Sequence, residues 1–298
     1  MVDIHTFFDS NAFTPNGVVA LARQHGVTHV IFSPPAVVGA TRKSAILYWF
    51  QRVMLRSNVL SPLASLAAST FYDKSGVLRK TWRVGIDGDE SYHSVEIPDN
   101  HGLAQALETV GVGVFRWYWI NPLKSSLERD SLVLKDPKVV GIKIHPYWHR
   151  FGAEYVEQVL NVAQVSSLPV YMHMGYRGLS QIVEVLTAYP KVSVLLACGG
   201  YPHFDRVWRK VRRLDNVCVD VASQHIDVRG IRAAAHVLGD ERILFSTDAP
   251  YSFADTDDVS SYKGLVNRIQ RVFSQPEAFE RVTRLNAFKR IPRLVQYE

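Results

Sequence analysis

The stretch Ile243-Leu-Phe-Ser-Thr-Asp-Ala-Pro-Tyr251 has the form of a buried strand that runs directly into a carboxylate. Its apolar start, Ile243 to Ser246, is short and is soon followed by Pro250, which favours a β-strand. A carboxylate just past the end of a buried strand, here Asp248, is costly to bury unless it is paired or binds a metal. In a parallel α/β fold, sites are built at that rim. The alternative is that Asp248 caps a loop or a helix.

Short apolar runs alternate with longer amphipathic runs along the 298 residues of the chain. The expected strands are Val2–His5, Thr28–Ser33, Val112–Trp119, Val139–His145, Pro169–His173, Val192–Ala197, Asn216–Val221 and Arg242–Thr247. The expected helices between them include Pro15–Gln24, Ala153–Val165, Leu179–Ala188, Phe204–Leu214 and Ile226–Leu238. Eight strand–helix alternations with apolar strands predict an α/β fold, a single (β/α)8 TIM-type barrel over residues 1–298.

The alternation breaks once, between the second and third strands, where residues 34–111 are far longer than an ordinary connection. Within this insertion, Ala45–Met54 and Leu60–Ser69 are expected to be helical. Val77–Ile97 is expected to form a β-hairpin around Asp87-Gly-Asp. We expect the insertion to cover the C-terminal rim of the barrel as a lid or an oligomer contact. The alternative is an ornament away from the site.

The composition points to a soluble globular protein in a reducing compartment. The chain is 47% hydrophobic and 21% charged, which suits one large α/β domain or two small ones. No apolar run reaches the roughly 18 residues that a membrane span needs. Two cysteines do not make a disulfide framework, so a cytoplasmic location is expected. The net charge of +6 is mostly dispersed, and its one basic cluster, Arg206 to Arg213, has the spacing of a solvated helix face. No nucleic-acid partner is expected, because nothing beside that cluster resembles a base-reading module.

Polar side chains lie at the carboxyl ends of four of the expected strands. His5 ends the first strand, Lys143 and His145 the fourth, His173 the fifth, and Asp248 follows the eighth. In a barrel these ends converge on one mouth. Neutral imidazoles and a carboxylate are suitable ligands for Zn²⁺, Fe or Mn²⁺, and three ligands with an open position would activate a bound water. The pattern therefore predicts a metal site, although each histidine taken alone can equally be structural.

Further candidates for substrate binding lie on or just past strand ends. Lys143 can stabilise an oxyanion or a substrate carboxylate, or it can form a structural ion pair. Trp117 and Trp119 share a face of the third strand and can wall a pocket or lie in the core. The remaining candidates, which can equally be ordinary rim residues, are His149, Arg150, Tyr176 and Arg177.

Six short motifs occur in the order and at the spacing of one known family. They are Val2-Asp-Ile-His-Thr-Phe7, similar to D-x-H-x-H; Gly141-Ile-Lys-Ile-His-Pro146, similar to G-x-K-x-H-P; Pro169-Val-Tyr-Met-His-Met-Gly175, similar to a fifth-strand histidine motif; Leu195-Leu-Ala-Cys-Gly-Gly200, which keeps the frame of A-H-x-G-G; Leu244-Phe-Ser-Thr-Asp-Ala-Pro250, similar to F-G-S-D-x-P; and Leu285-Asn-Ala287, similar to a C-terminal N-A. With these motifs the chain resembles the amidohydrolase superfamily, in its amidohydrolase-related branch. That branch includes aminocarboxymuconate semialdehyde decarboxylase and resorcylate-type decarboxylases.

The resemblance implies a metal held by first-strand histidines, a fifth-strand histidine and an eighth-strand aspartate. His5, His173 and Asp248 keep those positions. Phe7 stands where the second first-strand histidine belongs, and Ala197 stands where the family has a sixth-strand ligand or acid–base histidine. Neither side chain can bind a metal or move a proton. His203, a few residues further on, can replace the sixth-strand histidine only if its loop folds back.

Three functional interpretations remain open. In the first, His5, His173 and Asp248 bind one divalent metal, zinc in first place, with His145 as a fourth ligand, for hydrolysis of a C–N or C–O bond in a small carboxylate-bearing molecule. In the second, the barrel works without metal, with Asp248 as a general base or a partner of His173 and Lys143 as an electrostatic clamp. The runner-up chemistry is a lyase reaction such as non-oxidative decarboxylation. In the third, the chain is a non-catalytic binding protein. A homodimer is left open.

Overall fold

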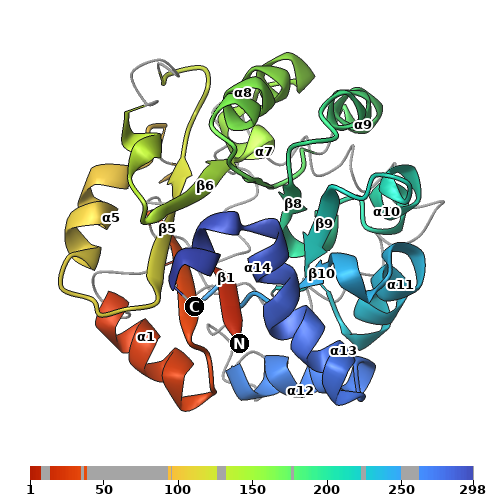
Figure 1. The fold of residues 1–298 in the computed structure, drawn as a ribbon. Coiled ribbons are helices and arrows are strands. Elements are labelled where there is room, and N and C mark those ends of the chain that lie inside the picture. The colour runs from red at the N-terminus through yellow and green to blue at the C-terminus, as the bar shows by residue number, and fades with distance from the viewer. Residues whose placement is uncertain are drawn as a thin grey trace, which may run out of the picture.

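The computed structural model describes residues 1–7, 14–34, 37–38, 93–94, 96–125, 132–175, 178–222, 226–249 and 262–297. Within these stretches strands and helices alternate, and the helices surround the strands (Figure 1). None of the helices in the described part of the chain has the length and apolar character needed to cross a membrane.

Eight parallel strands form the main sheet of the described residues. They are β1 (Val2–Phe7), β2 (His29–Ser33), β5 (Val114–Trp119), β6 (Val139–Ile144), β7 (Val170–Met172), β8 (Val194–Leu196), β9 (Val217–Asp220) and β10 (Ile243–Leu244). Neighbours in the sheet follow chain order, from β1 to β10. The barrel closes where Thr6 bridges Ala249 and the Phe7 amide donates to the Ala249 carbonyl at 2.6 Å. The predicted (β/α)8 barrel is confirmed.

The surrounding helices are α1 (Pro15–Gln24), α5 (Asn100–Leu107), α7 (Pro146–His149), α8 (Ala153–Val165), α9 (Leu179–Ala188), α10 (Asp205–Val211), α11 (Val228–Leu238) and α12 (Tyr262–Val272). Local sequence explains where several of them begin. The Thr14 side chain accepts a hydrogen bond from the Gly17 amide at the start of α1, with Pro15 in the first turn, and Asp227 caps α11 in the same way. The predicted bounds of α1, α8 and α9 are those observed.

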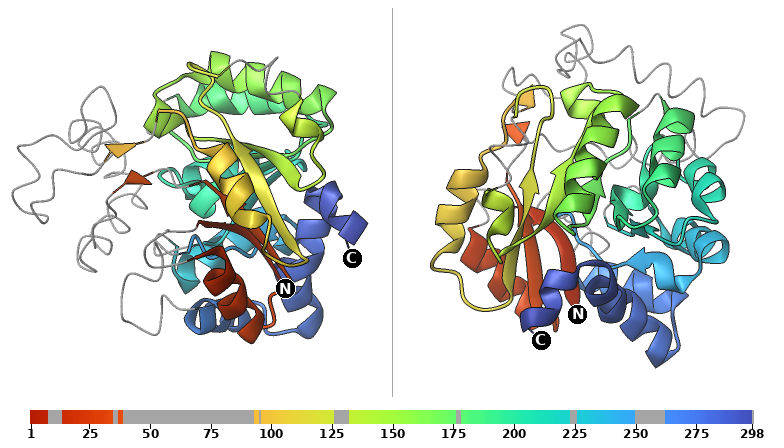
Figure 2. Two further views of the ribbon diagram at one scale, coloured as in Figure 1. Left: turned by 90° about the vertical axis from the view of Figure 1, so that its left-hand side faces the viewer. Right: turned by 45° about the horizontal axis from the view of Figure 1, so that its top comes forward.

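The C-terminal segment closes the amino end of the barrel. It comprises α13 (Pro276–Glu280), the π-helical turn η5 (Arg281–Leu285), α14 (Asn286–Arg290) and the 3-10 helix η6 (Pro292–Tyr297). Phe288, Ile291 and Leu294 belong to one buried cluster with Val2 and other barrel-interior residues. The two termini lie near each other at this end (Figure 2). The mouth at the carboxyl ends of the strands is thus the end available for a site.

Several elements depart from the expected bounds. The last strand ends at Leu244 rather than at Thr247, because the following residues turn toward β1, where the Ile4 amide donates to the Phe245 carbonyl. Both α10 and α11 are shorter than expected. Three 3-10 turns, η1 (Val133–Lys135), η2 (Ala197–Gly200) and η3 (Asp240–Arg242), precede β6, follow β8 and precede β10.

The insertion is described only near its two ends. The expected helices Ala45–Met54 and Leu60–Ser69, and most of the expected hairpin Val77–Ile97, lie outside the described residues. The short strands β3 (Val37–Val38) and β4 (His93–Ser94) pair antiparallel, so the two ends of the insertion run side by side. Helix α5, which the sequence reading did not anticipate, is held to β5 because the Asn100 side chain bonds both backbone groups of Trp119.

Candidate active site

Three polar side chains from distant parts of the sequence form a chain at the barrel mouth. The amino group of Lys143 on β6 lies 2.7 Å from Nε2 of His5 on β1. Nδ1 of His5 lies 3.2 Å from an Asp248 carboxylate oxygen, in the turn after β10. With its proton on Nδ1, His5 faces the carboxylate with a donor and Lys143 with an acceptor. We call these three residues the polar chain.

An irregularity in β1 helps to place His5. The register between β1 and β2 shifts between Asp3 and Thr6. Strand alternation alone would put Asp3 and His5 on one face. Instead, Asp3 bonds Thr247 and Tyr262, whereas His5 contacts Lys143 and packs on Tyr171 with ring centroids 4.5 Å apart. Irregularities of this kind commonly re-aim side chains near sites.

The amino group of Lys143 is fully buried among aromatic rings. It lies 4.0 Å from the ring centroid of Trp119, 4.2 Å from that of Phe7 and 5.6 Å from that of Tyr171. Ring faces attract a cation, more strongly once water is excluded. Burial acts in the other direction and lowers the pKa of Lys143 well below its usual value, while the Asp248 carboxylate opposes that shift.

Asp248 is the partly accessible end of the polar chain, with a side chain 14% exposed. Burial raises the pKa of its carboxyl to about 8, and Lys143 opposes the rise. Its backbone lies in the left-handed region, with φ of 55°, and its amide donates to the His5 carbonyl at 2.9 Å. Aspartate tolerates this conformation better than most residues. Cys198 brings its thiol to 4.0 Å from the other carboxylate oxygen.

Three nearly parallel rings lie next to the polar chain. The centroid of His145 is 4.1 Å from that of Trp148 and 4.3 Å from that of His173, with interplanar angles of 4° and 10°. His145 is held because its Nδ1 accepts the Trp148 amide at the start of α7. Burial, His173 and His149 lower the pKa of His145 well below its usual value, so His145 is neutral at pH 7. We call Trp148, His145 and His173 the ring stack.

Asp220, at the end of β9, supports the site from below. Its carboxylate accepts the Tyr171 hydroxyl and the amides of Cys198 and Ala222. Burial raises its pKa to about 6, and these hydrogen bonds limit the rise. The Cys198 backbone is held with φ of 50°, in the left-handed region. Asp220 therefore fixes both the ring that packs on His5 and the turn that presents Cys198 to Asp248.

The residues expected to hold a metal are brought together, but they do not form a suitable ligand set. His5 faces Lys143 with one nitrogen and Asp248 with the other. A divalent ion on Nε2 would compete with the Lys143 amino group for the same lone pair. Phe7 and Ala197 offer no donor atoms. Among the described residues, no three His, Cys, Asp or Glu side chains are grouped so as to hold a metal ion. The described donors therefore do not fit a divalent metal.

The remaining sequence candidates take different positions. Trp119 walls the site, whereas Trp117 lies deep in the barrel with Nε1 donating to the Ile4 carbonyl at 2.7 Å. The His149 ring lies 5.9 Å from that of Trp119, and Arg150 is exposed where α7 ends. His203 commits Nε2 to the Gly175 carbonyl at 2.7 Å. Tyr176 and Arg177 lie outside the described residues.

Four residues that matter to the site were not singled out for it from the sequence. They are Tyr171, Trp148, Cys198 and Asp220, the last of which ends a strand. The strand-end rule would have found Asp220, since it applies to β9 as it does to the other strands. No local signal marks Tyr171, because its hydroxyl partner lies 49 residues away.

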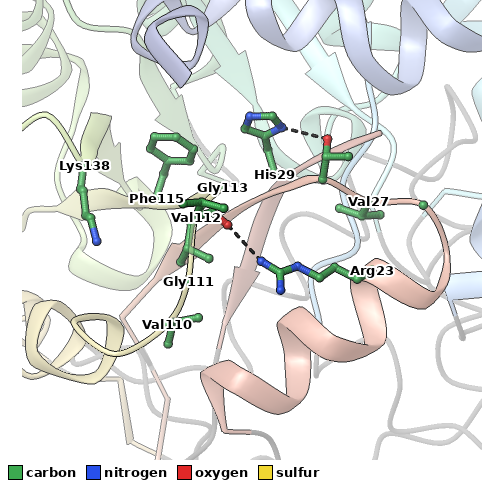
Figure 3. Close-up of a pocket in the computed structure, with 12 residues that line it drawn as sticks. Arg23, Val27, His29, Val110, Gly111, Val112, Gly113, Phe115 and Lys138 are labelled. Carbon is green, nitrogen blue, oxygen red and sulfur yellow. Dashed lines mark hydrogen bonds between the residues drawn. The ribbon is translucent and has the colours of Figure 1, made fainter. Parts of the chain in front are cut away.

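A hollow of about 910 Å³ lies away from this site (Figure 3). It is lined by residues around the amino ends of β2 and β5, where the Arg23 guanidinium donates to the Val112 carbonyl at 3.1 Å. The lining is mostly apolar. Because the polar chain lies at the carboxyl ends of the strands, the hollow is separate from the candidate active site.

Comparison with known proteins places the chain in a family. Residues 46–289 match the family model described as amidohydrolase, and because this span is more than half of the chain, the protein belongs to the amidohydrolase family. The resemblance read from the motifs is thereby confirmed. A comparison with the curated proteins finds no significant match.

Solved structures with the same fold share little sequence with this chain. A 2,6-dihydroxybenzoate decarboxylase from Rhizobium superposes with a TM-score of 0.59 at 12% identity, over 98% of this chain and 99% of that one. A probable 2-pyrone-4,6-dicarboxylic acid hydrolase from Acinetobacter baumannii, with citric acid bound, has a TM-score of 0.60 at 9% identity, over 98% of both chains. A 5-carboxyvanillate decarboxylase from Novosphingobium aromaticivorans, complexed with manganese, has a TM-score of 0.56 at 12% identity, over 92% and 79%. At such identities the likeness establishes the fold alone.

Proposed function

We propose that this protein is a lyase that removes a carboxylate as CO2 from a small, flat, unsaturated or aromatic acid. The observation that carries the proposal is the position of the Asp248 carboxyl, partly exposed at the end of the polar chain, in which the His5 ring lies 6.0 Å from the His173 ring of the ring stack. This interpretation replaces hydrolysis as the first choice, because two of the three similar structures described above are decarboxylases.

The chemistry requires a proton donor at the carbon that loses its carboxylate. The bond between that carbon and the carboxyl carbon breaks, CO2 leaves, and a proton from the enzyme takes its place on the carbon. Asp248 can supply that proton, because burial raises its carboxyl pKa to about 8 and so keeps it protonated at neutral pH. Its exposed edge allows solvent to return the proton.

The other residues have supporting roles in this proposal. The partly exposed His173 and the edge of Trp148 offer an aromatic surface against which a flat substrate can lie. The Lys143 amino group has no exposed surface, so it acts on the substrate through its electrostatic field and through His5 rather than by contact. We therefore regard Asp248 and His173 as the catalytic residues and Lys143 as a positioning residue.

Hydrolysis is the second candidate, favoured by the similarity to the probable 2-pyrone-4,6-dicarboxylic acid hydrolase. In that reaction Asp248 would act as a base toward water. The two reactions differ in their products, since only the lyase releases CO2 and only the lyase places a solvent proton on carbon.

The test is to incubate the protein with 2,6-dihydroxybenzoate, 5-carboxyvanillate and related hydroxylated aromatic acids in D2O. A lyase releases CO2 and yields a product with one deuterium at the former carboxyl position. We expect Asp248→Asn to lower kcat by about 100-fold or more, the usual contribution of a general acid. The matched control is Asp215→Asn, at an exposed aspartate before β9. Ring opening of 2-pyrone-4,6-dicarboxylate without CO2 release would favour the hydrolase instead.

A further inference from the structure

We infer that the amino group of Lys143 takes the position on which the ligand-type residues of this barrel converge, so that a side-chain nitrogen of the chain itself stands where the family resemblance implies a divalent metal. This inference goes beyond the proposed reaction, because it concerns the group at the centre of the site. It applies equally to a lyase and to a hydrolase.

The first support is convergence. The resemblance assigns positions 5 and 7 of the first strand to a metal, and both side chains contact the same nitrogen atom. Nε2 of His5 lies 2.7 Å from Nζ of Lys143, and the Phe7 ring centroid lies 4.2 Å from it. The carboxylate of Asp248, at a third such position, is joined to the other nitrogen of His5. Two positions that the resemblance assigns to a metal thus contact the lysine nitrogen, and a third is joined to it through His5.

The second support is the replacement at position 7. The motif that this chain shares with the family already contains a lysine at 143, so the lysine alone is not the departure. Phe7 removes an imidazole donor and supplies a second ring face to the amino group, beside that of Trp119, whose centroid lies 4.0 Å from it. An aromatic box suits an ammonium group and offers nothing to a divalent ion. Ala197 removes a further donor in the same neighbourhood.

The third support is exclusion. A divalent ion binds an imidazole nitrogen at roughly 2.0–2.1 Å. Such an ion on His5 Nε2 would need the lone pair that already accepts the Lys143 amino group at 2.7 Å, so binding requires Lys143 to leave. Lys143 has no exposed surface and is enclosed by side chains, which leaves it little room to move aside.

The experiment measures metal rather than activity. Wild-type protein purified without chelator is analysed for its metal content and titrated with Mn²⁺, with free Mn²⁺ followed by electron paramagnetic resonance. Two double variants are measured beside it, Phe7→His with Lys143→Met and Phe7→His with Lys135→Met. Lys135 is exposed in η1, so the second variant has the same two types of substitution but keeps the Lys143 amino group at the centre of the site. Circular dichroism establishes that each variant is folded.

We expect wild type to contain far less than one ion per chain and to show no saturable Mn²⁺ binding. The Phe7→His, Lys143→Met variant should bind Mn²⁺ about 100-fold more tightly than the Lys135 control, because changing even the groups that hold the ligands of a metal alters its affinity by roughly 10–100-fold. One tightly bound divalent ion per wild-type chain would overturn the inference. So would a Lys135 control that gains Mn²⁺ as tightly as the Lys143 variant. If the Lys143 variant does not fold, the wild-type measurement decides alone. These outcomes do not depend on CO2 release, so the inference and the proposed reaction fail separately.

Discussion

Two carboxylates beside β1, the buried Asp3 and the partly exposed Asp248, have opposite surroundings. Asp3, in the seam between β1 and β10, accepts hydrogen bonds from the His5 and Thr247 amides and from the Thr247 and Tyr262 hydroxyls. Asp248, in the mouth, has only the His5 ring and the Cys198 thiol beside its carboxylate oxygens among the side chains that the structure describes. Burial raises the pKa of Asp3 to about 6 and that of Asp248 to about 8, and the difference follows from the hydrogen bonds that Asp3 receives.

The comparison distinguishes a carboxylate that stabilises the fold from one that can take part in proton transfer. A carboxylate whose oxygens are filled by fixed donors joins elements and has nothing left to exchange. A carboxylate that is buried with few donors retains a proton at neutral pH and can transfer it. The two regions should therefore respond oppositely to the same isosteric change, aspartate to asparagine.

The largest stability effect is expected for Asp3→Asn. The asparagine side chain can accept hydrogen bonds only at its oxygen, whereas both oxygens of Asp3 accept. Its NH2 group would therefore face the Thr247 and Tyr262 hydroxyls, which donate to Asp3. We expect a loss of about 3–4 kcal/mol in the free energy of unfolding, because a buried charged network is being broken. Asp248→Asn should change the unfolding free energy by no more than about 1 kcal/mol in either direction while removing activity. Urea denaturation of both variants checks this, and equal losses from the two would remove the distinction.

His203 lies between these two carboxylates in how fully it is hydrogen-bonded, because it is buried with one ring nitrogen bonded to the Gly175 carbonyl. Burial lowers its pKa from 6.5 to about 4. A depressed histidine pKa means that the neutral form is favoured in the folded state, so its contribution to stability is present above pH 6.5 and is lost as the pH falls toward 4. A shift of this size corresponds to about 3 kcal/mol.

The His203→Gln variant keeps a donor for the Gly175 carbonyl but has no group that titrates in this range. From pH 7 to pH 4 we therefore expect its free energy of unfolding to fall by up to about 3 kcal/mol less than that of wild type. The control is His101→Gln, at an exposed position on α5, which should follow the wild-type pH profile. Parallel pH profiles for wild type and His203→Gln would show that His203 does not behave as a buried neutral group.

Among the changes around Asp3, Tyr262→Phe is expected to have a smaller effect than Asp3→Asn. This change removes one of the four donors to Asp3, a hydroxyl at 2.6 Å, and leaves the ring in place. We expect a loss of about 1.5–2 kcal/mol, the range for a hydrogen bond to a charged group. In the Asp3→Asn background the same change should cost much less. A double-mutant cycle measures the difference, and full additivity would mean that the hydroxyl does not act through Asp3.

The sequence was enough to predict the order of the strands and helices and which residues lie at the strand ends. The alternation of apolar runs predicted the barrel, and the helix start expected at Pro15, a residue suited to the first turn, is the observed start of α1. Strand-end positions also brought His5, His145, His173 and Asp248 to one mouth. These features are local, because burial of a strand and capping of a helix depend on neighbouring residues.

The sequence by itself determined which residues reach the mouth of the barrel, and only the tertiary structure decided what they do there. His5 and Lys143 are 138 residues apart, and Asp3 and Tyr262 are 259 apart. No local pattern therefore shows that the Lys143 amino group meets the His5 ring, or that the Tyr262 hydroxyl donates to the Asp3 carboxylate. The position of the Lys143 amino group between Phe7 and Trp119 depends on side-chain packing across three strands. Periodicity specifies a face of a strand, whereas the contact that a side chain makes on that face depends on every other strand that reaches it.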